Sequence, residues 1–179
     1  MSPFMPRNVE IKARISNFEE VACLAAALAD HGPTEIAQDD TFFFCGNGRL
    51  KLREFTPHQG ELIFYRRADQ AGPRESFHVR AATTEPARLR QALTLAYGAS
   101  GRVIKQRRLF LLGRTRIHLD QVRGLGSFLE LEVVLEEAEP ADRGAREAEK
   151  IMQQLGIASS QWIEGAYVDL LAAIGATPR

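Results

Sequence analysis

The stretch RNVEIKARI, from Arg7 to Ile15, decides the fold class because its polar and apolar residues alternate without interruption. One parity holds Val9, Ile11, Ala13 and Ile15, and the other holds Asn8, Glu10, Lys12 and Arg14. A period of two residues predicts a β-strand with one apolar and one polar face. The apolar face needs a core to cover it, whereas the polar face presents a carboxylate followed by two cations and needs an explanation of its own.

Several later segments repeat this division into an apolar and an ionic face. Their ionic parities hold, strand by strand, Arg49, Lys51 and Arg53; Lys105 and Arg107; Arg116, His118 and Asp120; and Glu130 and Glu132. For any one strand, an antiparallel sheet with a solvent-exposed face is a sufficient explanation. Taken together with helices whose apolar stripes must cover the apolar face of the sheet, the pattern favours a closed sheet with its ionic face inside.

Turn and capping residues divide the chain into about eight strands and four helices. Beyond the strand at 7–15, we expect strands over 40–45, 48–55, 61–67, 74–80, 103–112, 115–120 and 128–137, and helices from the cap at 16–17 to 32, over 86–97, over 142–155 and over 160–174. Short turns such as GNG at 46–48 predict antiparallel neighbours, and antiparallel strands in this number can close into a barrel that holds side chains or one small ligand. We therefore expect an α+β fold, a closed eight-stranded antiparallel β-barrel (a tunnel) with flanking helices, as a single domain over residues 1–179.

The composition argues against several classes of protein. The chain has 179 residues, 23 of them basic and 23 acidic, so its net charge gives no reason to expect nucleic acid or a membrane surface as a partner. It has no apolar run near the roughly 20 residues that span a bilayer, and MSPFMPRN lacks the apolar region of a signal peptide. Cys23 and Cys45 are isolated thiols without CxxC spacing, which fits a reducing compartment. We expect a cytoplasmic protein, with a homodimer as the alternative to a monomer.

The charges are nevertheless unevenly distributed. Six basic residues and no acidic one lie from Arg102 to Arg116, and six acidic residues lie from Asp120 to Glu139 with one arginine among them. An inward ionic lining is costly unless its charges meet partners or a ligand. Lysine and arginine bind phosphate oxygens, and carboxylates hold Mg²⁺ or Mn²⁺, which also contact phosphates. The pattern therefore indicates a polyphosphate with a divalent metal as the ligand.

Four motifs together resemble the CYTH superfamily, the triphosphate tunnel metalloenzymes. They are VEIK at 9–12, KLR at 51–53, the K-x-R pattern that starts at Lys105, and HLDQVRGLGSFLELE at 118–132. Each motif is weak alone, but their order and spacing are specific, and the resemblance spans residues 8–169. Within the superfamily the chain is most similar to class IV adenylate cyclases and to thiamine triphosphatase-like proteins. The resemblance implies a closed tunnel that binds a triphosphate with Mg²⁺ or Mn²⁺.

The resemblance also implies roles for individual residues. The phosphate-binding set is Lys12, Arg53, Arg66, Lys105 and Arg107, and the metal-binding set is Glu10, Asp120, Glu130 and Glu132. Of these, Glu10, Lys12 and Glu130 are the expected catalytic residues. Arg67 is the alternative to Arg66 if the strand slips by one residue. The spacing of His118 and Asp120 is that of a metal pair, but HxD is a weak signal, and a hydrogen-bonding role in the wall is the preferred interpretation of His118.

One position departs from the ExExK signature of the family, because Asn8 stands where the first glutamate is expected. An amide oxygen can ligate a metal but brings no charge, and losing a unit charge about 4 Å from a metal matters by a few kcal/mol at most. The preferred function is a class IV adenylate cyclase-type enzyme that converts ATP to 3′,5′-cyclic AMP and pyrophosphate. The alternatives are hydrolysis of inorganic, thiamine or nucleoside triphosphate, and non-catalytic binding of a polyphosphate or nucleotide, which Asn8 motivates. No motif for adenine recognition stands out.

Overall fold

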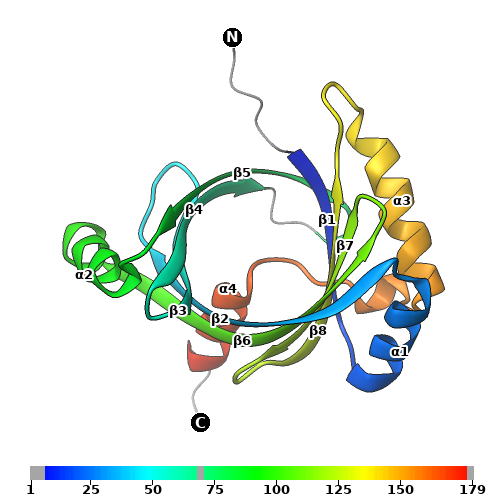
Figure 1. Ribbon diagram of the computed structural model, residues 1–179, viewed down its shortest axis with the longest axis horizontal. Coiled ribbons are helices and arrows are strands. Elements are labelled where there is room, and N and C mark those ends of the chain that lie inside the picture. Colours follow the sequence, from blue (N-terminus) through cyan, green and yellow to red (C-terminus); the bar gives the residue numbers. More distant parts are fainter. Residues whose placement is uncertain (1–6, 68–70, 177–179) are drawn as a thin grey trace.

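Eight strands form a closed barrel in which every neighbouring pair is antiparallel (Figure 1). A computed structural model of the chain describes residues 7–67 and 71–176, and the strands lie within these ranges. Around the barrel the strands follow the order β1-β5-β4-β3-β2-β6-β7-β8. Their bounds are β1 Arg7–Arg14, β2 His31–Phe43, β3 Arg49–Thr56, β4 Gln59–Arg67, β5 Arg74–Thr83, β6 Ala99–Leu112, β7 Thr115–Val122 and β8 Gly126–Val134. This architecture confirms the predicted α+β fold, a closed antiparallel barrel with flanking helices.

The helices flank the barrel. Within the described ranges they are α1 Phe18–Leu28, α2 Pro86–Tyr97, α3 Ala141–Gln154 and α4 Tyr167–Ala176, with a 3₁₀ turn at Ser159–Gln161. Figure 1 shows α1 and α3 on the side of β1, β7 and β8, and α2 on the side of β3. Asn17 caps α1, since its Oδ1 accepts a hydrogen bond from the Glu20 backbone N–H at 3.2 Å. In the part of the chain described here, no helix combines the length and the apolar character needed to cross a membrane.

The apolar parity of the strands faces outward and packs under these helices. Val9 and Ile11 of β1 are at most 1% exposed and share a cluster with Ile151 and Met152 of α3. A second cluster differs, because it lies on the inward parity: it joins residues of β2, β6, β7 and β8 to the start of α4 at one end of the barrel. Full burial of each such aliphatic side chain stabilises the fold by about 1.5–3 kcal/mol. Because the apolar parity packs outside the barrel, the ionic parity lines the lumen, as the sequence predicts.

Two strands begin well before their predicted starts: β6 begins at Ala99 and not at residue 103, and β2 differs most. β2 begins at His31, whereas the sequence predicted a strand from Asp40. The reason is its partner: β6 pairs with β2 along nearly its whole length, from Leu111 opposite His31 to Ala99 opposite Phe43. Pairing with a long neighbour therefore holds residues 31–39 extended, although they carry no alternating apolar pattern.

The last helix also differs from its prediction, because it begins at Tyr167 and not at residue 160. The preceding residues pair with β1 instead: Trp162 forms a bridge with Ala13, and the Ile163 N–H donates to the Lys12 carbonyl at 2.9 Å. Gly165 then adopts a φ of +76°, which glycine tolerates and which ends the extended segment. As a result, α4 starts at one end of the barrel and packs against β6.

Candidate functional site

The inward parity of the strands encloses a cavity of about 330 Å³ along the barrel axis. All of the strands contribute to its lining, and so does the first turn of α4. Its ionic lining residues are Glu10, Lys12, Asp40, Lys51, Arg53, Glu61, His78, Arg80, Lys105, Arg107, Arg116, His118, Glu130 and Glu132. A volume in this range suits one small ligand, and most of the ionic groups belong to two walls of different character.

The basic wall consists of two Lys-x-Arg pairs, Lys51 with Arg53 on β3 and Lys105 with Arg107 on β6. A buried aspartate on a neighbouring strand holds each pair. Asp40 of β2 accepts hydrogen bonds from Lys51 Nζ at 2.8 Å and from Arg53 Nε and Nη2 at 2.7 and 2.8 Å. Because one carboxylate faces two cations, this group keeps a net positive charge, and the bidentate contact fixes the orientation of the guanidinium.

The second pair is held in the same way. Asp120 of β7 is fully buried and accepts hydrogen bonds from Lys105 Nζ at 2.8 Å and from Arg107 Nε and Nη2 at 2.6 and 2.7 Å. The Tyr167 hydroxyl adds a further hydrogen bond to Asp120 at 3.0 Å. These partners occupy both carboxylate oxygens, so Asp120 acts as the counter-ion of the basic wall.

Burial changes the proton affinity of both wall lysines. It lowers the pKa of Lys105 to about 7, with the charge of Arg107 acting in the same direction and that of Asp120 opposing it. It lowers the pKa of Lys51 to about 8, again together with a neighbouring arginine. Burial alone would raise the pKa of Asp120 and of Asp40, but the adjacent cations outweigh it and hold both far below their ordinary values. At neutral pH the aspartates are therefore ionised, Lys51 is mostly protonated and Lys105 is near its titration midpoint.

Tyr167, the first residue of α4, closes one end of the tunnel, which we call the closed end. Its ring lies under two ammonium groups, with its centroid 4.1 Å from Lys12 Nζ and 5.0 Å from Lys105 Nζ. Figure 1 shows α4 beside β2 and β6. This approach requires a glycine on β6, because a Cβ at Gly101 would lie 2.4 Å from Val168 Cγ2. At the opposite, open end, the described lining comes from strands alone.

The acidic wall lies on β1, β7 and β8 and consists of Glu10, His118, Glu130 and Glu132. In the register of β1 with β8, Glu132 is opposite Glu10, and Glu130 is opposite Lys12. Lys12 Nζ lies 3.1 Å from Glu130 Oε2. Carboxylates from adjacent strands thus gather at one place in the lumen. Their neighbouring cations are Lys12 beside Glu130, Arg116 at 3.4 Å from Glu132 and Arg74 at 4.0 Å from Glu10.

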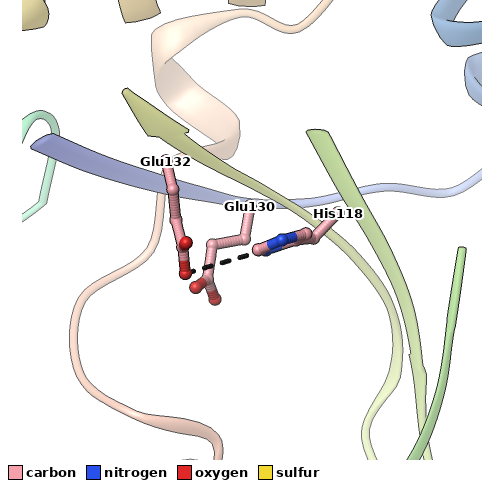
Figure 2. Close-up of side chains that lie close together, drawn as sticks. All are labelled: His118, Glu130 and Glu132. Carbon is pink, nitrogen blue, oxygen red and sulfur yellow. Dashed lines mark ion pairs between the residues drawn. The ribbon is translucent and has the colours of Figure 1, made fainter. Parts of the chain in front are cut away.

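Three of these side chains form a compact group that could hold a metal ion. His118, Glu130 and Glu132 are buried, and each offers one ligand atom within 4.8 Å of the others. Figure 2 shows them turned toward one another, with His118 Nδ1 3.8 Å from Glu132 Oε1. His118 Nδ1 is buried and has no hydrogen-bond partner. Two carboxylates and an imidazole with an unused ring nitrogen fit a divalent cation.

The protonation states of this group also suit a cation. Burial lowers the pKa of His118 well below its ordinary value, so the imidazole is neutral. Burial alone would raise the pKa of Glu130, but Lys12 and the wall cations outweigh it and hold that pKa well below its ordinary range. Burial, together with the charges of Glu130 and Glu10, raises the pKa of Glu132. A neutral imidazole and an ionised carboxylate are the forms that ligate metals, and a bound cation would relieve the repulsion at Glu132.

A sequence model of the CYTH domain family matches residues 6–167, which is most of the chain. The chain belongs to the CYTH domain family. A comparison of this CYTH protein with curated proteins gives no match.

The fold of this CYTH domain recurs in solved structures of low sequence identity. A protein from Pyrococcus horikoshii is 20% identical, with a TM-score of 0.78 over 91% of this chain and 98% of its own. A Vibrio parahaemolyticus protein described as a candidate adenylate cyclase is 19% identical, with a TM-score of 0.75 over 92% of this chain and 97% of its own. A Hippeastrum protein described as a candidate adenylyl cyclase with a dominant triphosphatase activity is 16% identical, with a TM-score of 0.65 over 96% of this chain and 97% of its own. At these identities the likeness shows a shared fold.

Most residues that the sequence singled out meet in the lumen of this CYTH domain. Those that line the cavity, each at most 8% exposed, are Glu10, Lys12, Arg53, Lys105, Arg107, Glu130 and Glu132. Arg66 does not join them: it is exposed on the outer face, where its Nε donates to the Asn47 carbonyl at 2.9 Å. The cause is the alternation of side chains along β4, since Tyr65 takes the inward parity. The side chain of Arg67 lies outside the described residues.

Asp120 and His118 contact groups other than those that their expected roles predict. Asp120 was expected among the metal ligands, but both of its oxygens are bound to the basic wall and to Tyr167. His118 was expected in a hydrogen-bonding role, but its ring lies in the compact group with Glu130 and Glu132. The HxD spacing puts both side chains on the inward parity of β7, and the neighbouring strands decide which one meets cations and which one meets carboxylates.

Two residues of the site were missed from the sequence. Asp40 stood at the expected start of a strand, so its shared parity with Gln38 became visible only once β2 was extended. Tyr167 was expected to be a packing residue. It does pack against Phe128, at 4.9 Å between ring centroids, but it also contacts the lysines and Asp120. For Tyr167 the sequence carried no signal beyond an apolar stripe.

Asn8, the position that departs from the family signature, lines the same cavity. It is 2% exposed and lies opposite Ser76 in the register of β1 with β5. Its Oδ1 is buried and has no hydrogen-bond partner. A buried carbonyl oxygen without a partner is costly, so this position next to Glu10 has the chemistry of a ligand-binding group without the charge of a carboxylate.

Proposed function

We propose that this CYTH protein is a metal-dependent enzyme that acts on a triphosphate, of the class IV adenylate cyclase type. In that reaction the 3′-oxygen of ATP forms a bond to the α-phosphorus, the bond from that phosphorus to the β-phosphate oxygen breaks, and pyrophosphate and the hydroxyl proton leave. The observation that carries the proposal is one closed lumen in which a basic wall and a compact acidic group both face the same cavity.

The basic wall supplies the phosphate site. Lys12, Arg53, Lys105 and Arg107 are the proposed phosphate ligands, and Lys51 joins them because it shares the Asp40 carboxylate with Arg53. Each Lys-x-Arg pair keeps a net positive charge after its aspartate is counted, and the aspartate fixes the cations in place before any ligand arrives. Binding of a polyanion therefore costs little reorganisation of the wall.

The acidic wall supplies the proposed metal site. Glu10, Glu130 and Glu132 would hold Mg²⁺ or Mn²⁺, with His118 as a further ligand, whereas Asp120 is occupied as a counter-ion. A bound divalent ion would supply activation of the attacking hydroxyl and neutralisation of charge on the phosphate oxygens. The protein side chains orient the triphosphate chain and exclude bulk water from it. Glu10, Lys12 and Glu130 remain the proposed catalytic residues.

The order of the groups along the axis supports reaction at the α-phosphorus. Lys12 and Lys105 lie over Tyr167 at the closed end, while Glu132 is one inward position farther from that end than Glu130. A nucleotide that enters terminal phosphate first would bring that phosphate to the lysines and leave its α-phosphate nearer the acidic wall. Cyclisation needs the metal at that position.

Hydrolysis of a triphosphate is the second candidate, because the same walls would serve attack by water. The Hippeastrum protein with this fold is described by its dominant triphosphatase activity. Non-catalytic binding of a polyphosphate or nucleotide is the third candidate, and the uncharged Asn8 is the observation that favours it.

Product analysis separates these functions. The protein is incubated with ATP, thiamine triphosphate and tripolyphosphate, each with Mg²⁺ or Mn²⁺, and the products are resolved by chromatography. We expect cyclic AMP and pyrophosphate from ATP. Orthophosphate without cyclic AMP would favour the hydrolase, and tight binding without turnover would favour the binding protein.

A further inference from the structure

The open end of the tunnel carries apolar side chains that the packing of the barrel does not use. Ile36, Phe55 and Leu109 line the cavity and are half-buried, and they belong to neither of the two hydrophobic clusters found among the described residues. Phe42 and Val103, apolar lining residues near the closed end, differ from them because they belong to the cluster that holds α4. Inorganic polyphosphate has no apolar part that could pack against a surface of this kind.

Gln38 lies within this apolar group and brings a polar edge to it. Ile36 and Gln38 are successive inward residues of β2, and Phe55 lies beside Gln38, because it follows Glu54, which is opposite Asp39. Gln38 is 5% exposed, lines the cavity, and has a buried Oε1 without a hydrogen-bond partner. An unpaired amide oxygen in a buried position is costly unless a ligand donates to it. We call Ile36, Gln38, Phe55 and Leu109 the mouth patch.

We propose that the mouth patch binds the base of a nucleoside triphosphate and prefers a base with an amino group beside a ring nitrogen, as adenine has. This inference rests on the proposed function and identifies the residues that select the base of its substrate. A primary amide pairs with that edge by accepting from the amino group and donating to the ring nitrogen. The flat ring of Phe55 and the aliphatic side chains of Ile36 and Leu109 supply the apolar surface on which a base can stack.

The position of the mouth patch agrees with the proposed order of the phosphate-binding and metal-binding groups along the tunnel axis. It lies on β2, β3 and β6, the strands that carry the basic wall, and on the open-end side of that wall. In the registers, Leu109 is opposite His118 and Ile36 is opposite Arg107. A base at the mouth therefore leaves its phosphates to extend inward past the acidic wall toward the lysines over Tyr167.

The test compares two ligands that share the triphosphate and differ in the base. Calorimetry in the presence of a chelator, which prevents metal-dependent turnover, measures the Kd of ATP and of tripolyphosphate for the native protein and for Gln38→Leu and Phe55→Ala. Gln121→Leu is the matched control, because Gln121 is exposed on the outer face of β7. We expect each mouth-patch variant to weaken ATP binding about tenfold, to leave tripolyphosphate within about twofold, and the control to change neither.

Inosine triphosphate sharpens the test, because it replaces the amino group of adenine with a carbonyl oxygen. The native protein should bind it about tenfold more weakly than ATP, and Gln38→Leu should remove most of that difference. Equal weakening of ATP and tripolyphosphate in both variants, or no weakening of either, would overturn the inference while leaving a triphosphate site in place. Absence of binding of every triphosphate to the native protein would overturn the proposed function and this inference together.

Discussion

The two walls of the tunnel both involve buried carboxylates but hold them with different tightness. In the basic wall, the hydrogen bonds accepted by Asp40 and Asp120 measure 2.6 to 3.0 Å, and both carboxylates are fully engaged. In the acidic wall, Glu130 lies 3.1 Å from a lysine and Glu132 lies 3.4 Å from an arginine. The carboxylates of the basic wall are satisfied within the protein, whereas those of the acidic wall gather around a common point.

This difference separates acids that serve folding from acids that are available to a ligand. The wall cations hold the pKa of Asp120 far below its ordinary value, whereas burial and neighbouring carboxylates raise the pKa of Glu132. Ionised Asp120 therefore stabilises the folded protein, and ionised Glu132 destabilises it until a cation arrives. The predictions below test this contrast, from the largest expected effect to the smallest.

Removing the counter-ion of the basic wall should have the largest effect. Asp120→Asn leaves Lys105 and Arg107 buried without their carboxylate, which should lower the free energy of unfolding by about 3–5 kcal/mol. Glu132→Gln removes like-charge repulsion and should cost less than about 1 kcal/mol or increase stability. Urea unfolding at pH 7 without metal measures both. Equal destabilisation by the two variants would abolish the distinction between the walls.

Removing a carboxylate from the acidic wall should affect turnover instead. Glu130→Gln keeps the size of the side chain and removes its charge. Because a metal ligand is lost, we expect metal-dependent turnover to fall by about a hundredfold or more. Circular dichroism controls for folding. A well-folded Glu130→Gln protein that turns over at the native rate under limiting Mg²⁺ would remove Glu130 from the proposed metal site.

The basic wall should make phosphate binding depend on pH. Burial lowers the pKa of Lys105 to about 7 and that of Lys51 to about 8, whereas a bound polyanion favours the charged lysines. Binding above pH 7 therefore requires proton uptake, and affinity for tripolyphosphate should fall as pH rises from 6 to 9, by at most about tenfold per pH unit for each proton taken up. Lys105→Arg stays charged over this range and should reduce the slope. An unchanged slope in this variant would show that Lys105 does not titrate on binding.

Restoring the missing carboxylate should have the smallest effect. Asn8→Glu places a second acid beside Glu10, so Mn²⁺ affinity should rise several-fold, while the metal-free variant should be slightly less stable than the native protein. Calorimetric titration with Mn²⁺ gives the affinity and stoichiometry, and an activity assay at saturating metal follows. The same stoichiometry and affinity in both proteins would show that position 8 does not control a metal site.

The sequence predicted the barrel and its ionic lumen because both follow from a single local property, the two-residue alternation along each strand. It could not assign partners across the lumen. Lys105 and Glu130 were expected to face inward, but the division into two walls depends on which strands are neighbours, and strand order is a property of the closed barrel. The alternation also placed Asp120 and His118 side by side without showing which one meets the cations.

The remaining differences come from segments whose structure their neighbours impose. Asp40 joins the lumen because β6 extends β2, and Tyr167 does so because the segment before it pairs with β1. Neither contact has a local pattern in the sequence. The mouth patch was missed for a related reason, since Gln38 lies in the part of β2 that the sequence did not predict as a strand.

The central claim is that one wall binds phosphate and the other binds metal, and separate titrations of the two ligands test it most directly. Tripolyphosphate without metal, and Mn²⁺ without phosphate, are titrated by calorimetry into the native protein, Lys105→Ala and Glu10→Gln. We predict that Lys105→Ala weakens tripolyphosphate binding and leaves Mn²⁺ affinity unchanged or higher, and that Glu10→Gln weakens Mn²⁺ binding and leaves tripolyphosphate affinity unchanged or higher. If both variants weaken both ligands alike, or if neither variant changes either ligand, the assignment of the two walls is contradicted.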